Sequence, residues 1–213
     1  FYVNHTIGNV WSRAILDHNI DSVLYTRKRH AMSNFSNVLP DIQSDLANQI
    51  LKDPYNFDFL TMTNDYNEKE LEKALTDNIT NFLLELGKGF AYVGKQIQLE
   101  VGGKMFFTDL LFYHLELRCF VVIELKNRDF DPSFLGQLNF YVSAVNHIMK
   151  KETDSPTIGL LICKTKNNVV AQYALETTNL PIGISEYELN RLMPENFKSS
   201  LPTIEEIENQ LKD

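Results

Sequence analysis

The sequence predicts an α/β fold in which helices flank a mixed central sheet. From residue 68 onward, helical and strand-like segments follow the order α-β-β-β-α-β-α-β. Short turns separate the first three strand-like segments, which implies antiparallel pairing, whereas a long helix before the fourth implies a parallel crossover. A mixed sheet flanked by helices satisfies both observations.

Each of these elements has its own signal. The first helix carries one apolar stripe, and Gly87 and Gly89 mark its end. Gly102-Gly103 separates the first two strands. Asp131-Pro132 fits a helix start, with aspartate as the N-cap and proline at the first helical position. The predicted elements are a helix ending at residue 86, strands 90–99, 104–113 and 118–126, helix 132–151, strand 157–164, helix 168–175 and strand 181–187.

The first 60 residues are predicted to be helical and separate from the sheet. Ser12 is a candidate N-cap of a helix whose apolar residues recur at helical spacing up to residue 24. The basic cluster 27–30 follows and fits either a solvated face or a phosphate-binding patch. A polar loop over 31–40, a short helix over 44–52 and a turn at 53–56 complete the segment.

These signals divide the chain into three parts. Residues 1–64 are interpreted as a helical remnant of an N-terminal domain plus a linker, 65–190 as the main domain, and 191–213 as a C-terminal acidic tail helix. The N-terminal apolar residues are too few for a core of their own, so we expect this segment to pack on the main domain or on a partner chain. A homo-oligomer or a partner protein would use the same segment.

The composition is that of a globular protein and excludes other classes. The 213 residues are 44% hydrophobic and 23% charged, with a formal net charge of −8. No run approaches the roughly 18 apolar residues of a membrane span, so no membrane partner is expected. The acidic balance disfavours a general nucleic-acid coat, which is usually basic, but it allows an enzyme that engages DNA locally.

Two cysteines bear on the compartment. Cys119 and Cys163 lie in apolar runs, which predicts two buried free thiols. Free thiols are typical of reducing compartments, so we expect a cytoplasmic protein. The chain begins at Phe1 and no signal-peptide pattern follows. We therefore interpret it as part of a longer protein or as a chain trimmed of a tag.

Three charged residues interrupt strands that are otherwise apolar. Asp109 lies in the second strand, and Glu124 and Lys126 end the third. A charge in a buried strand is costly unless it is paired or binds a metal. Period-2 alternation puts Glu124 and Lys126 on one face of their strand. If the two strands form a hairpin, Asp109 falls opposite or diagonal to Glu124, with Cβ atoms within about 5–8 Å.

Two carboxylates this close indicate a metal site. They repel each other unless a proton or a cation lies between them. Oxygen ligands with room for water suit Mg²⁺ or Mn²⁺, which would lower the pKa of a bound water and neutralise a phosphate oxygen. Lys126 could then position the attacking water and stabilise developing charge. The competing interpretation is a strand end at which these charges reach solvent and form ordinary ion pairs.

The spacing Asp109, fourteen residues, then Glu124-x-Lys126 resembles the core of the PD-(D/E)XK nuclease superfamily. The order α-β-β-β-α-β is also similar to the restriction-endonuclease-like fold of that superfamily. Thr108 stands where the motif's name has proline, a position that is loose in the superfamily. More specifically, the chain resembles the YhcG-like family of bacterial proteins. The runs that carry this resemblance are WSRAILDHNIDSVLY, SDLANQILKDPYNFDFL, FLLELGKGFAYVGKQ, DLLFYHLELRCFVVIELK, GQLNFYVSAVN and PIGISEYEL.

The resemblance implies a nuclease domain downstream of a helical domain that binds DNA or a partner. It implies Asp109, Glu124 and Lys126 as catalytic residues, with Mg²⁺ or Mn²⁺ as the cofactor. Gln137 and Tyr141 resemble the Gln-x-x-x-Tyr element of RecB-like nucleases, and we expect both to have a role in the site. A surface glutamine above a half-buried tyrosine is the alternative.

A further metal ligand is expected on the helix before the first strand, where nucleases of this superfamily often carry a glutamate. Helical geometry at about 100° per residue places Glu72 inside the apolar stripe that must face the sheet. An acid there is costly without a partner, so we expect Glu72 to complete the metal site of Asp109 and Glu124. Glu68 shares this direction but stands at the helix start, where acids usually serve the dipole. Glu72 could instead be a buried acid paired with a lysine or tyrosine.

The predicted function is the hydrolysis of phosphodiester bonds in DNA by a Mg²⁺- or Mn²⁺-dependent deoxyribonuclease. The main alternative is a non-catalytic nuclease-like domain that binds nucleic acid or assembles a protein complex. The intact set of Asp109, Glu124 and Lys126 favours the enzyme, because a scaffold has no physical need for it. A third interpretation is a dimerisation or partner-binding module whose acidic tail contacts another protein.

Overall fold

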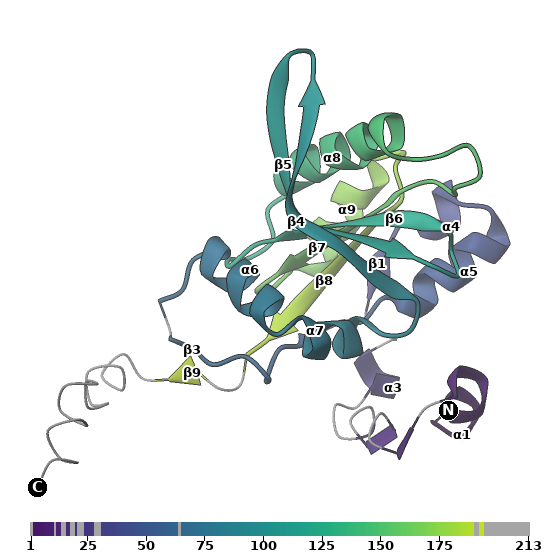
Figure 1. Ribbon diagram of the computed structural model, residues 1–213, viewed down its shortest axis with the longest axis vertical. Coiled ribbons are helices and arrows are strands. Elements are labelled where there is room, and N and C mark those ends of the chain that lie inside the picture. The colour runs from purple at the N-terminus through teal and green to yellow at the C-terminus, as the bar shows by residue number, and fades with distance from the viewer. Residues whose placement is uncertain are drawn as a thin grey trace, which may run out of the picture.

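The computed structural model describes residues 2–10, 12–13, 16–17, 20, 24–27, 31–63, 65–189 and 192–193. Within them, seven strands form one sheet in the order β1-β8-β7-β6-β5-β4, and β2 also pairs with β8 (Figure 1). These strands are β1 (Met32–Ser33), β2 (Tyr55–Asn56), β4 (Phe90–Val101), β5 (Lys104–His114), β6 (Cys119–Leu125), β7 (Ile158–Cys163) and β8 (Ile182–Glu188). A separate parallel pair joins β3 (Met62–Thr63) to β9 (Leu192–Met193).

The sheet is mixed. β4, β5 and β6 pair antiparallel, whereas β6, β7 and β8 pair parallel. α8 (Phe134–Ile148) forms the crossover from β6 to β7, and α9 (Asn168–Glu176) forms the one from β7 to β8. This arrangement confirms the predicted α/β fold with a mixed, helix-flanked central sheet.

Each face of the sheet has its own hydrophobic core. α6 (Glu68–Asp77) and α7 (Ile79–Leu86) pack into one core, and α8 and α9 pack into the other. Leu110 contributes to the first core and its neighbour Leu111 to the second, because alternate residues of a strand point to opposite faces. The site residues of β5 and β6 therefore have helices on either side.

The helix expected up to residue 86 is two helices, α6 and α7. Asn78 is the C-cap of α6 and the N-cap of α7, and its side-chain Nδ2 donates to Ala74 O (3.0 Å). The apolar stripe continues across the break, since Leu75 and Phe82 are both fully buried in one core. α8 also begins later than predicted: Ser133 is its N-cap, while Asp131 accepts a hydrogen bond from the Ser133 N–H.

Residues 31–63 contribute to the main sheet. The segment predicted as a loop over 31–40 contains β1 and α4 (Phe35–Val38), and both β1 and β2 pair with β8. Phe35 and Tyr55 are fully buried in the same core as α6 and α7. The boundary predicted at residue 64 therefore does not coincide with a break in packing, because strand pairing over more than 100 residues leaves no local signal in the sequence.

Arg27, expected on a solvated face or in a phosphate-binding patch, is buried. Its guanidinium pairs with Glu85 of α7, whose carboxylate also lies 3.7 Å from Lys52 Nζ. The remaining short helices are α1 (Tyr2–Asn9), α3 (Leu24–Arg27) and α5 (Asp41–Ile50). Residues 28–30 of the basic cluster, much of the helix expected over 12–24 and nearly all of the expected tail helix lie outside the described residues.

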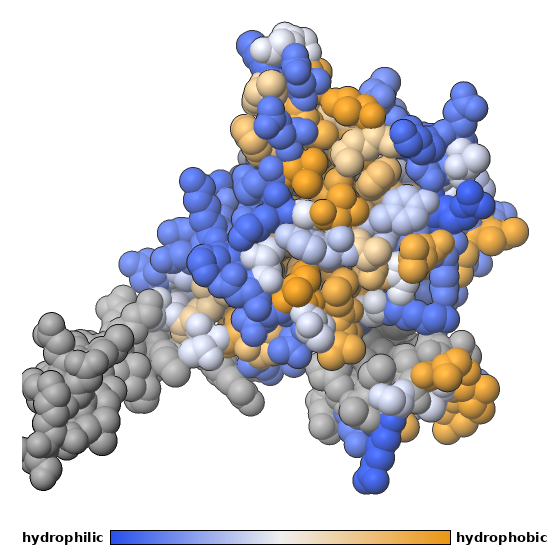
Figure 2. All heavy atoms as spheres, in the orientation of Figure 1, coloured by the Kyte–Doolittle hydropathy of each residue, from blue (hydrophilic) through white to orange (hydrophobic). Residues whose placement is uncertain are grey.

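No helix among the described residues is long and apolar enough to cross a membrane. Cys119 and Cys163 are free and buried, as predicted, and burial raises the pKa of each thiol to about 12. The β4–β5 hairpin protrudes from the sheet, and Figure 2 shows hydrophobic surface beside it. Exposed side chains of the hairpin include Met105 and Phe107.

Candidate functional site

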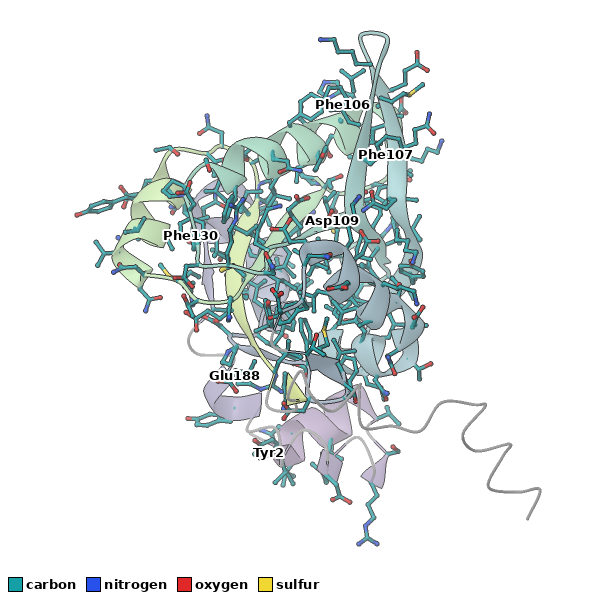
Figure 3. All side chains as sticks on the ribbon, turned by 90° about the vertical axis from the view of Figure 1, so that its left-hand side faces the viewer. Tyr2, Phe106, Phe107, Asp109, Phe130 and Glu188 are labelled. Atoms are coloured by element: carbon teal, nitrogen blue, oxygen red, sulfur yellow. The ribbon has the colours of Figure 1, made fainter. Side chains whose placement is uncertain are left out.

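The site lies where β5 separates from β6. The backbone ladder between them ends at Leu110↔Ile123. One residue further, the Asp109 side chain replaces the ladder, since its Oδ2 accepts a hydrogen bond from Leu125 N (2.9 Å). Figure 3 shows Asp109 near the base of the hairpin, between α8 and α6. The backbone of β6 thereby fixes one carboxylate oxygen of Asp109.

Three polar residues form a row across β4, β5 and β6. The register of β5 with β6, continued one residue beyond Leu110↔Ile123, puts Glu124 opposite Asp109, which is one of the two positions that a hairpin allows. The register of β4 with β5, which pairs Lys95 with Leu110, puts Gln96 opposite Asp109 on the other side. Gln96 has a positive φ of 48°, so the chain leaves regular strand geometry beside the site.

Glu124 and Lys126 form a buried ion pair at the end of β6. Lys126 Nζ donates to Glu124 Oε1 at 2.9 Å, and the two residues are 5% and 0% exposed, respectively. The second oxygen, Glu124 Oε2, is buried with no hydrogen-bond partner among the described residues. These charges therefore do not reach solvent at the strand end, which was the competing interpretation.

α6 brings two further carboxylates to the site. Glu72 is 7% exposed, and its Oε2 accepts a hydrogen bond from Gln96 Nε2. Glu68 lies one turn earlier on the same helix face, with Oε2 3.4 Å from Lys126 Nζ. Glu68, expected to serve the helix dipole, thus contacts the lysine, while Asn67 and Glu70 form the capping box of α6.

α8 contributes the tyrosine of the predicted pair. Gln137 is exposed, and its Nε2 donates to Tyr141 OH (3.1 Å), whereas Tyr141 is 7% exposed. Burial raises the pKa of Tyr141, and the negative charges of Glu124 and Asp109 raise it further. Both carboxylates therefore act electrostatically on the tyrosine hydroxyl. Gln137 is connected to the site by its hydrogen bond to this hydroxyl.

The pKa values of the two central carboxyl groups, Asp109 and Glu124, are raised. The pKa of Asp109 is raised to about 6, mainly by burial and also by the charges of Glu72 and Glu68, against the lowering effect of the Leu125 N–H. Burial and the nearby Asp109 raise the pKa of Glu124 to about 7. Lys126 opposes both shifts. Burial lowers the pKa of Lys126 itself, but the surrounding acids, chiefly Glu124, raise it overall.

These shifts predict how stability depends on pH. The pKa values of about 6 and about 7 exceed the ordinary carboxyl values of about 4, so near pH 6 the folded state holds protons that the unfolded state has lost. Without metal, the free energy of unfolding should therefore fall as pH rises from about 5 to about 8. A divalent cation held by the two carboxylates would offset this loss, because a cation binds the deprotonated form.

Thermal melting in EDTA and in Mg²⁺ across this range measures the effect. Glu124→Gln is the matched control, because it keeps the shape of the side chain but does not titrate. The melting temperature of the variant should change less with pH than that of the unsubstituted protein. Equal slopes for the two proteins in EDTA would contradict the shift at Glu124.

The oxygen donors fit a divalent cation of the Mg²⁺ type. Asp109 and Glu124 face each other, and Glu124 Oε2 is buried without a hydrogen-bond partner among the described residues, so it is available to a cation. The described residues contain no group of three or more His, Cys, Asp or Glu side chains that could hold a metal ion. Two carboxylates suffice for Mg²⁺, which commonly keeps several waters. Glu72, the third predicted ligand, bonds instead to Gln96 in this structure.

Comparison with known proteins places the chain in a family. Residues 48–202 match the family described as the YhcG PDDEXK nuclease domain. The chain belongs to this family. One YhcG relative is "Putative nuclease YhcG" of Escherichia coli (strain K12), which is 32% identical over 192 residues. The match covers 89% of this chain and 51% of the relative, so the chain spans about half the length of that protein.

Two solved structures show a weaker likeness to this YhcG domain. A repair endonuclease from Pyrococcus abyssi is 21% identical with a TM-score of 0.39, over 60% of this chain and 49% of that chain. A structure described as an EndoMS-dsDNA2 complex is 20% identical with a TM-score of 0.39, over 60% and 44%.

Glu68 and Gln96 lie at the candidate site although sequence reasoning did not place them there. Glu68 had a signal, because it lies four residues before Glu72 on the same helix face. Gln96 had none, since its position opposite Asp109 depends on the register of β4, which shifts between Tyr92 and Gly94. An irregularity of this kind is not visible in the alternation of residue types.

Proposed function

We propose that this domain is a Mg²⁺- or Mn²⁺-dependent nuclease that hydrolyses phosphodiester bonds in DNA. One observation carries the proposal. Asp109 and Glu124 are opposed carboxyl groups with raised pKa values, and Glu124 has a buried oxygen without a partner. Such an arrangement is costly in a protein unless a cation or a proton compensates for it. Nucleases of the PDDEXK type generally use divalent metals, which supports the cation.

Each residue has a distinct task in this proposal. Asp109 and Glu124 would hold the cation, with the Leu125 N–H orienting the Asp109 carboxylate. The cation supplies Lewis acidity toward a phosphate oxygen and toward water. Lys126 remains protonated at neutral pH, because the nearby acids raise its pKa. It can therefore donate to the attacking water and to the charge that develops on the phosphate. Tyr141, oriented by Gln137, would contact the substrate.

A cleavage assay tests the proposal. The protein would be incubated with single-stranded, double-stranded and branched DNA in Mg²⁺, Mn²⁺ or EDTA. We expect cleavage in at least one metal and none in EDTA. Cleavage that persists in EDTA would exclude the metal-dependent chemistry, and intact DNA of every type in both metals would favour a non-catalytic domain.

The alternative is a nuclease-like domain that binds nucleic acid or assembles a protein complex without chemistry. Size measurement with and without DNA distinguishes the two kinds of binding. The buried ion pair of Glu124 and Lys126 favours the enzyme, because a binding module gains nothing from charges hidden at 0% and 5% exposure. A homo-oligomer or a partner protein would join through the N-terminal segment.

Glu72→Gln tests the third proposed metal ligand. The substitution keeps the shape of a side chain that is 7% exposed but removes its charge. If Glu72 supports the metal, activity falls and more Mg²⁺ is needed for half-maximal activity, while thermal stability holds or rises because a buried charge is lost. Glu70→Gln is the matched control, because Glu70 lies two residues from Glu72, points away from the site and is exposed in the capping box of α6. Unchanged activity of Glu72→Gln at every Mg²⁺ concentration would remove Glu72 from the site.

A further inference from the structure

Arg128 lies at the edge of the site, two residues beyond Lys126. It belongs to the segment that leaves β6, and its backbone carbonyl accepts a hydrogen bond from Lys164 N (3.1 Å). The guanidinium carbon lies 4.8 Å from the centroid of the Phe134 ring, and Lys126 Nζ lies 5.6 Å from the same centroid. Two cations therefore share one aromatic ring at the start of α8.

Arg128 is exposed, and its side chain makes no ion pair or hydrogen bond with the described residues. Two aspartates are close in sequence, but both have other partners. Asp129 accepts from Thr165 Oγ1 (2.6 Å), and Asp131 accepts from Ser133 N (2.8 Å). The hydrogen bonds from Ser133 are the main reason that the pKa of Asp131 is lowered, and Arg128 is the smallest contributor. The donors of the guanidinium are thus available to a ligand.

The surrounding charges indicate which ligand this is. Four carboxyl groups and one lysine make the site acidic, and the whole chain carries a formal charge of −8. A polyanion is repelled by such a site unless cations at its edge compensate. We propose that Arg128 binds a backbone phosphate of the nucleic acid, next to the phosphate that is cleaved. This inference rests on the proposed nuclease function.

An arginine at position 128 suits a phosphate better than a lysine at the same position would. A guanidinium is planar and donates two parallel hydrogen bonds to a phosphate. The Phe134 ring already holds the guanidinium by a cation–π contact, which limits the side-chain entropy lost on binding. A phosphate contact carries no sequence information, so Arg128 contributes equally to the binding of every DNA sequence.

The test measures DNA affinity separately from chemistry. Dissociation constants would be measured by fluorescence anisotropy with labelled oligonucleotides of different sequence, in Mg²⁺, at several salt concentrations. The Glu124→Ala background prevents turnover during the measurement. Three variants are compared with this background: Arg128→Ala, Arg128→Lys and Lys164→Ala. Lys164 is the matched control, because it is an exposed cation on the adjacent segment for which no aromatic contact is observed among the described residues.

Arg128→Ala should weaken binding about tenfold for every sequence and reduce the salt slope by about one. Arg128→Lys should recover the slope but not the full affinity. Lys164→Ala should change neither. In the active protein, Arg128→Ala should raise KM and leave kcat at saturating DNA unchanged.

Equal weakening by Arg128→Ala and Lys164→Ala would overturn the proposal, because it would reveal a general effect of charge. If Arg128→Ala leaves the DNA affinity unchanged while the unsubstituted protein cuts DNA, only the role of Arg128 would be overturned. An unsubstituted protein that neither binds nor cuts DNA would overturn the proposed function, and the role of Arg128 with it. Melting curves of each variant confirm that the fold persists.

Discussion

Replacing Glu124 with alanine is expected to abolish metal-dependent DNA cleavage while the protein stays folded. The substitution removes the carboxylate that faces Asp109 and contacts Lys126. Loss of this proposed metal ligand should lower kcat by roughly 10³-fold or more, which corresponds to about 4 kcal/mol of transition-state stabilisation. Single-turnover cleavage of the preferred DNA in Mg²⁺ measures the change. The protein is kept in excess of the DNA and at a concentration above the dissociation constant.

Two variants make this result specific. Glu124→Gln keeps the volume of the side chain, so its loss of activity cannot come from a cavity. Glu116→Ala removes an exposed acid that pairs with Lys88 far from the motif, and it should retain full activity. Equal cleavage by the unsubstituted protein and Glu124→Ala, or cleavage by both in EDTA, would exclude Glu124 as a metal ligand.

The sequence predicts the centre of this site because two local rules suffice there. Asp109, Glu124 and Lys126 are the charges in otherwise apolar strands, and period 2 sets their directions. The short connection between the two strands sets their register, and this register brings Asp109 and Glu124 together. The family resemblance adds the chemistry to a geometry that the residues already imply.

The periphery of the site depends on contacts between distant parts of the chain. Glu68 meets Lys126 over a separation of 58 residues, and the pairing of Arg27 with Glu85 spans the same separation. Helical phase restricts Glu68 to one face, but it does not say which strand residue that face meets. The break at Asn78 also escapes pattern analysis, because the apolar stripe continues through it.

The fold shows the same contrast. The core elements from residue 90 to 188 have strong periodicity and short connections, and their observed bounds lie close to the predicted ones. β1 and β2 are only two residues long and pair with β8 over more than 100 residues, so they leave no periodic signal. The polar, proline-containing segment 31–40 is therefore interpreted as a loop, although it contains the edge strand β1.

Lys126→Ala should separate binding from chemistry. Lys126 lies 2.9 Å from Glu124 and 3.4 Å from Glu68, so acids of the site already hold its ammonium group. If the ammonium stabilises charge that develops only in the transition state, kcat falls about 10²–10³-fold while DNA affinity changes little. A mutant that loses affinity in proportion to activity would instead mark Lys126 as a phosphate-binding residue.

The same variant has a second signature, in its pH dependence. The charge of Lys126 and its hydrogen bond both lower the pKa of Glu124, which burial and Asp109 raise to about 7. Without the lysine this pKa must rise further, so more of Glu124 is protonated at neutral pH. The residual activity of Lys126→Ala should therefore increase with pH over a higher range than the activity of the unsubstituted protein does. Lys126→Met, which nearly keeps the length of the side chain but removes its charge, should behave in the same way. A profile of kcat against pH that keeps its midpoint in both variants would show that Lys126 does not control the protonation of Glu124, and the link between the ion pair and catalysis would be lost.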